Sequence, residues 1–97
     1  MIDLNGKQLE IINKILEKHL PKVKVVAFGS RVNNNSQKYS DIDLAIISEE
    51  KMTIEKMQKL KEEFEESELN IMVDIVEYNK VSESFKKNID AKNIQIQ

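Results

Sequence analysis

Two aspartates separated by one residue, Asp41 and Asp43, open an otherwise apolar run that ends at Ile47. A run of this composition predicts a β-strand over residues 41–47. Side chains alternate between the two faces of a strand, and residues two apart are separated by about 6.6 Å, so both carboxylates project from one face. Crowded carboxylates are costly unless a cation compensates them, and the run contains no Lys or Arg. The pair therefore predicts a site for a bound divalent cation.

A third carboxylate, Asp74, interrupts a second apolar run at residues 71–76, which also predicts a strand. If the two strands are neighbours, Asp74 completes a cluster of three oxygen ligands. Carboxylate oxygens suit Mg²⁺, with Mn²⁺ as the alternative, and Mg²⁺ keeps positions open for water and phosphate oxygens. Phosphoryl and nucleotidyl transfer need this arrangement, and Asp74 would also assist deprotonation of the attacking hydroxyl.

A candidate phosphate-binding turn, Gly29-Ser30-Arg31, follows a third predicted strand at residues 23–28. Gly29 is one of only two glycines in the chain, and a glycine lets the backbone approach a phosphate closely. Ser30 offers a hydroxyl and a backbone N–H, and Arg31 offers a charged fork. For Arg31, an ordinary surface position is an equally good interpretation. The turn predicts a triphosphate site that faces the aspartates.

Three helices and a closing strand surround these runs. Asn5 with Gln8 predicts a capped first helix that Pro21 stops, and Thr53 caps a second helix with an apolar stripe. Residues 82–90 predict a short third helix, residues 94–97 an edge strand, and residues 31–40 a polar loop with a helical turn near its start. His19 is expected near the first helix C-terminus, interacting with the helix dipole. This alternation predicts an α/β fold in which helices cover a sheet.

Composition narrows the function further. The 97 residues predict one domain over residues 1–97, and 15 basic against 17 acidic residues argue against strong nucleic-acid binding. Cys is absent, so any metal site must use oxygen ligands, which fits a reducing cytosol. Without a signal peptide or a long apolar run, no membrane association is expected and a cytoplasmic location is predicted.

The order of these motifs resembles the DNA polymerase beta-like nucleotidyltransferase superfamily. Phe28-Gly29-Ser30-Arg31, then Ser40-Asp41-Ile42-Asp43-Leu44, then a third aspartate on a later strand look like the minimal nucleotidyltransferase family within it. The resemblance implies the polymerase beta-like fold, a small mixed sheet flanked by helices. It also implies two Mg²⁺ ions on the three aspartates and ATP or another nucleoside triphosphate on Gly29 and Ser30.

Members of that family are often encoded beside a HEPN-domain partner. They are similar to antitoxins that neutralise a HEPN ribonuclease toxin, some by transferring AMP to one of its tyrosines. The first hypothesis is therefore an Mg²⁺-dependent enzyme that transfers NMP, most simply AMP from ATP, to a hydroxyl of a HEPN-domain protein, with Gly29, Ser30 and Arg31 holding the triphosphate.

Two alternatives remain open. Where the family continues Arg-Ala-Arg-Gly, this chain has Arg31-Val32-Asn33-Asn34, which removes the second arginine. A non-catalytic antitoxin that neutralises its partner by occlusion, with a vestigial nucleotide site, is therefore the second hypothesis. Transfer to a small molecule is third, since relatives of that kind carry a further acceptor-binding domain for which these residues leave no room.

Overall fold

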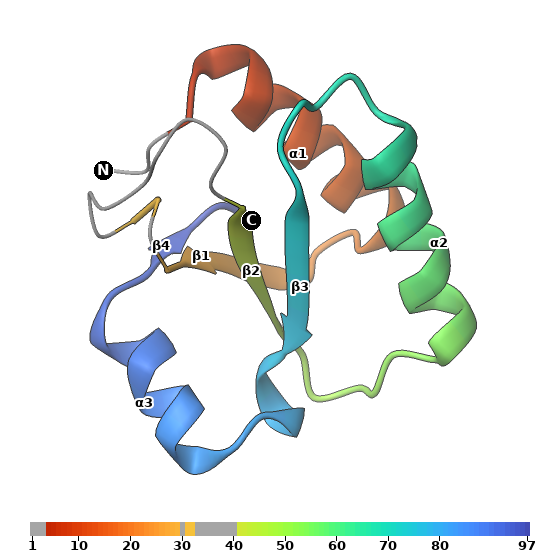
Figure 1. Ribbon diagram of the computed structural model, residues 1–97. Helices are drawn as coiled ribbons and strands as arrows, with labels where there is room; N and C mark the ends of the chain where they lie inside the picture. The colour runs from red at the N-terminus through yellow and green to blue at the C-terminus, as the bar shows by residue number, and fades with distance from the viewer. Residues whose placement is uncertain (1–3, 30, 33–40) are drawn as a thin grey trace.

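The computed structural model describes residues 4–29, 31–32 and 41–97 (Figure 1). The elements follow the chain in the order α1 (Gly6–His19), β1 (Lys24–Phe28), β2 (Ile42–Ile47), α2 (Ile54–Glu66), β3 (Val73–Glu77), the 3-10 helix η1 (Tyr78–Lys80), α3 (Glu83–Ala91) and β4 (Ile94–Gln95). The α/β class predicted from the sequence is confirmed. Residues 33–40, most of the predicted polar loop, lie outside the description.

The four strands form one mixed sheet in the order β3-β2-β1-β4. β2 pairs in parallel with β3 and antiparallel with β1, and β1 pairs antiparallel with β4. β3 and β4 are therefore the two edge strands. The strand predicted at residues 71–76 begins two residues late, because its paired ladder with β2 starts at Val73. Before the ladder, the Ile42 N–H donates to the Met72 carbonyl.

Polar caps fix where the helices begin. Asn5 and Gln8 form the predicted capping box, in which each side chain accepts a hydrogen bond from the backbone N–H of the other residue. Thr53 accepts in the same way at the start of α2. Ser82 does so before α3, so this helix starts at Glu83, one residue later than predicted. These local bonds satisfy N–H groups that the first helical turn leaves unpaired.

The sheet has a buried cluster on each face. α1 and α2 pack on one face, and α3 lies on the other (Figure 1). The larger cluster comprises side chains of α1, α2 and three strands, among them Ile12, Leu16, Leu60, Phe64, Val25, Ile42, Leu44 and Ile75. The smaller cluster comprises Val26, Phe28, Ala45 and Ile89. Because side chains alternate along β2 and β3, Asp43 and Asp74 lie on the same face as α3.

No helix in the described part of the chain has the length and apolar character needed to cross a membrane.

Candidate active site

Asp43 and Asp74 are direct partners in the parallel ladder between β2 and β3. The sequence-based expectation that the strand of Asp74 neighbours the strand of Asp43 is therefore confirmed. Asp41 lies two residues before Asp43, just outside β2, and is exposed. Asp74 is also exposed, whereas Asp43 is only partly so. The three predicted acidic residues thus lie at the ends of adjacent strands on one side of the sheet.

The electrostatics of Asp43 show that these carboxylates interact. Burial is the largest cause that raises the pKa of Asp43 above its usual value, and the negative charges of Asp74 and then Asp41 raise it further. A group held in this way is costly to ionise without a compensating positive charge. A bound cation would supply that charge.

Gly29 lies directly against Asp43. Its φ is +83°, a conformation that L side chains rarely adopt, and a Cβ added at this position would collide with Oδ2 of Asp43. The register explains the contact, because the preceding residue Phe28 is the cross-strand partner of Asp43. The predicted phosphate-binding glycine and the predicted metal-binding aspartate therefore belong to one site.

Arg31 is buried, with 6% of its surface exposed, and it is the only buried polar or charged residue among those that the structure describes. The interpretation of Arg31 as a surface residue is therefore wrong. The Val32 N–H donates to the Gly29 carbonyl at 3.0 Å, which closes a turn directly after β1. Ser30, the third predicted phosphate-binding residue, lies outside the described residues, as do Asn33 and Asn34.

The fit to a metal ion is partial in this conformation. Within the described ranges, no group of three or more Asp, Glu, His or Cys side chains is positioned to hold one ion. The donor chemistry nevertheless suits a hard divalent cation, because the three carboxylates share one side of the sheet and repel each other at Asp43. Coordination by all three would require side-chain rotation, which the exposed Asp41 and Asp74 are free to make.

An aromatic pair borders the site, and sequence reasoning missed it. The Phe85 ring of α3 meets the Phe28 ring edge to face, with centroids 5.8 Å apart, and 37% of Phe85 remains exposed. Phe28 is next to Asp43 across the strands. The sequence carried no signal for this pair, because the position of α3 on the sheet depends on the strand order.

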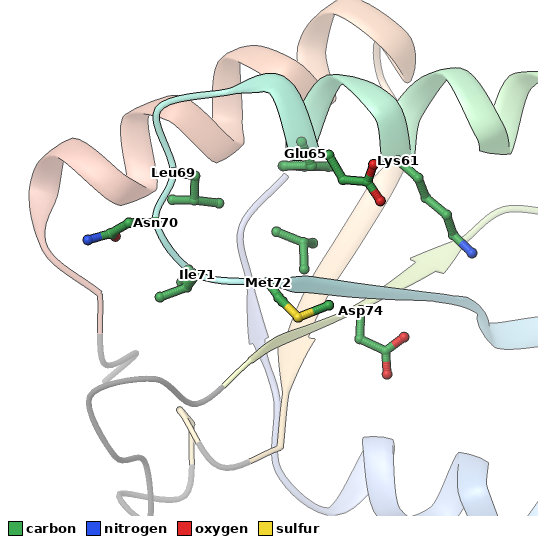
Figure 2. Close-up of a pocket in the computed structure, with 9 residues that line it drawn as sticks. Lys61, Glu65, Leu69, Asn70, Ile71, Met72 and Asp74 are labelled. Atoms are coloured by element: carbon green, nitrogen blue, oxygen red, sulfur yellow. The ribbon is translucent and has the colours of Figure 1, made fainter.

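A groove beside β3 was also not predicted. It has a volume of about 370 Å³ and lies between the C-terminal half of α2, the turn that follows it and the edge strand β3 (Figure 2). Its apolar lining residues are Phe64, Leu69, Ile71, Met72 and Val73. Its polar lining residues are Lys61, Glu65, Asn70 and Asp74. The groove therefore opens next to one of the three site carboxylates.

Comparison with known proteins agrees with this geometry. Residues 10–97 match the sequence model of the protein family described as "Polymerase beta, Nucleotidyltransferase". The chain belongs to this nucleotidyltransferase family. Among its relatives is a protein of Haemophilus influenzae named "Probable protein adenylyltransferase MntA", which is 42% identical over 96 residues, covering 99% of this chain and 84% of the relative.

Two solved structures share the fold of this nucleotidyltransferase. One, described as a toxin-antitoxin with AMP-PNP, aligns with a TM-score of 0.77 at 22% identity, over 92% of this chain and 72% of the other. The second, from Shewanella oneidensis, is a tri-AMPylated HEPN toxin in complex with an MNT antitoxin. It aligns with a TM-score of 0.72 at 21% identity, over 97% and 72% of the two chains. The predicted polymerase beta-like fold is thereby confirmed.

Proposed function

We propose that this nucleotidyltransferase is an antitoxin that transfers AMP from ATP to a hydroxyl of a HEPN-domain toxin. The observation that carries the proposal is the pairing of Asp43 with Asp74 beside Gly29, which joins the candidate metal ligands to the candidate phosphate-binding turn. The relative named as a probable protein adenylyltransferase supports a protein acceptor, since it matches nearly the whole chain. The AMPylated HEPN toxin of the Shewanella complex supports the class of partner.

The reaction balances with ATP and the acceptor hydroxyl alone. The acceptor oxygen forms a bond to the α-phosphorus of ATP, and the bond from that phosphorus to the oxygen bridging to the β-phosphorus breaks. Pyrophosphate leaves with the electron pair. The hydroxyl proton passes to Asp74 and then to solvent, because Asp74 is exposed and open to an incoming acceptor. The products are the AMP ester of the acceptor and pyrophosphate.

Each site residue has a separate task. Asp41 and Asp43 hold the metal ions, and Asp74 completes one ligand set. Gly29, whose positive φ other residues rarely adopt, holds the triphosphate through its backbone together with Ser30 and the guanidinium of Arg31. Family members typically use a divalent metal; two Mg²⁺ ions, or Mn²⁺ on the same ligands, would neutralise phosphate charge when bound. We place this activity in the cytoplasm, where ATP is available, and assign it to one domain at residues 1–97.

The test is transfer of label from α-labelled ATP. The purified chain is incubated with Mg²⁺, the labelled ATP and the HEPN-domain protein from the same genome, beside the Asp43→Asn variant. Label should appear on the HEPN-domain protein with the wild-type chain and be lost with Asp43→Asn. The exposed α2 residue Glu62 offers a matched control, and Glu62→Gln should retain transfer. Equal labelling by Asp43→Asn would contradict the proposal.

A second candidate function is neutralisation by occlusion without transfer. Two observations favour it: the three carboxylates do not converge on one ion among the described residues, and Asn33 replaces the second arginine of the family pattern. If it holds, cells that express the toxin will be protected equally by wild-type, Asp41→Asn and Asp43→Asn chains, and no label will reach the toxin. Loss of protection in both variants would reject occlusion.

A further inference from the structure

We propose that the outer edge of β3 and the groove beside it dock the acceptor segment of the toxin as an added extended strand. This inference rests on the proposed function and specifies how that acceptor is recognised. The contact lies next to Asp74, the carboxylate assigned to the acceptor hydroxyl, and is continuous with the active site.

The backbone of β3 is suited to such pairing because β3 is an edge strand. The Met72 carbonyl accepts the Ile42 N–H at 2.9 Å, so Met72 directs its backbone acceptor toward β2. Alternate residues of a paired strand direct these groups to opposite sides, which places the N–H and C=O of Val73 on the outer side. An extended peptide can form its backbone hydrogen bonds there.

The groove supplies an apolar anchor. Phe64 and Leu69 are buried lining residues of the groove, and Met72 lines it with 73% of its surface exposed. A methionine is flexible and packs well against partners of varied shape. Met72 thereby extends the apolar lining of the groove to the protein surface, and a contiguous apolar surface of this kind is typical of a binding site.

Strand alternation determines what the segment must contain. Val73 packs into the cluster beneath α2, whereas Figure 2 shows the Asp74 carboxylate pointing away from α2. A segment paired with β3 alternates in the same way, so its successive side chains enter the groove and approach Asp74 in turn. The acceptor should therefore carry its hydroxyl residue immediately next to an apolar residue.

Charge favours a basic segment. The stretch 61–68 contains five glutamates and one lysine. Lys18 and His19 contact Glu63, and Lys7 lies 3.9 Å from Glu68. Glu65 lines the groove and is exposed. Basic residues that flank the acceptor hydroxyl of the toxin would be attracted to this acidic stretch beside the groove and oriented by it.

Matched variants test the groove separately from the chemistry. Met72→Gln removes the exposed apolar anchor, and Ile54→Gln makes the same change at a residue 81% exposed and outside the groove. Glu65→Lys reverses a rim charge, and Glu17→Lys makes the same change on exposed α1 surface. We expect Met72→Gln and Glu65→Lys to raise the KM for the HEPN-domain protein by about tenfold, the size of one moderate interface contact. Both controls should retain the wild-type KM, and all four should bind Mg²⁺ and AMP-PNP as tightly as wild type.

Hydrogen exchange tests the backbone pairing. Binding of the HEPN-domain protein should slow exchange of the Val73 amide. In the HEPN-domain protein, the apolar residue next to the labelled residue can be truncated to Ala. This change should raise the KM for the HEPN-domain protein as Met72→Gln does. An unchanged KM for Met72→Gln, or a Val73 amide that exchanges at the same rate in the complex, would overturn the docking inference while leaving the transfer reaction intact. If wild type transfers no label, the proposed function fails, and the affinity of Met72→Gln for the HEPN-domain protein still decides whether the groove is the docking site.

Discussion

The Asp43 carboxylate occupies the space in which a side chain at position 29 would lie, and Gly29 meets it with a φ of +83°. The end of β1 and the start of β2 are therefore built around each other, through the direct pairing of Phe28 with Asp43. A phosphate held by the backbone at Gly29 would lie beside this carboxylate. The contact makes position 29 sensitive to substitution in a way that ordinary turn glycines are not.

Gly29→Ala should lose both stability and transfer. An alanine at positive φ costs about 1–2 kcal/mol, and its Cβ would also displace the Asp43 carboxylate. Urea unfolding measures the first effect and label transfer the second. Gly6→Ala is the matched control, because nothing lies within 4 Å of a Cβ at that helical position, and it should leave stability unchanged or raise it by about 0.5 kcal/mol. Equal behaviour of the two variants would contradict the assigned contact.

Asp43→Asn should change how stability responds to Mg²⁺ and to pH. The pKa of Asp43 is raised, so the folded state binds the proton more tightly than the unfolded state does; stability is lost as pH rises from 3.8 through the raised pKa. Without metal, the stability of Asp43→Asn should therefore increase relative to that of wild type as pH rises through that window. At neutral pH, Mg²⁺ should raise the melting temperature of wild type and not that of the variant.

Melting curves with and without EDTA, followed by added Mg²⁺, measure this difference. Glu62→Gln should respond to Mg²⁺ as wild type does. If Mg²⁺ leaves the wild-type melting temperature unchanged, the proposal of a metal site on these aspartates loses its support.

Sequence patterns predicted the local parts of the fold well. Asn5 and Thr53 begin helices through bonds to residues three positions on, as predicted, whereas Ser82 caps the third helix instead of being its first residue. The sequence also predicted that Asp74 lies beside Asp43, provided that their two strands are neighbours. β3 itself begins two residues later than its apolar run. Ser30 remains a prediction because it lies outside the described residues.

Features that depend on long-range packing were not predictable. His19 was expected to interact with the dipole of its own helix, yet its Nε2 lies 2.8 Å from Oε1 of Glu63 on α2. The sequence left a surface position open for Arg31, whereas the fold buries it with 6% of its surface exposed. The groove beside β3 exists only because β3 is an edge strand, and strand order is set by contacts far apart in the sequence.

Ile89 should be the main anchor of α3 on the active-site face. It is 1% exposed and is the only α3 residue in the smaller buried cluster, where it joins Phe28. Ile89→Ala should lower the free energy of unfolding by about 2–4 kcal/mol, because it leaves a cavity beneath the helix. Urea unfolding measures the loss, and Ile54→Ala, at an exposed position, should change stability by less than about 0.5 kcal/mol. A loss below about 1 kcal/mol for Ile89→Ala would show that α3 is held by other contacts.

The contact between α1 and α2 should weaken in acid through Glu63. The hydrogen bond from Lys18, followed by that from His19, lowers the pKa of Glu63 below its usual 4.5, and both donors lie 2.8 Å from Oε1. Because the folded pKa is the lower one, the stability that this group contributes is present above pH 4.5 and is lost as pH falls through the folded pKa. Glu63→Gln should therefore be less stable than wild type at neutral pH, and the two should converge as pH falls below 4.5. Urea unfolding at a series of pH values measures the difference, with Glu62→Gln showing none, and a gap that stays constant into acid would mean that Glu63 acts through packing instead of through its charge.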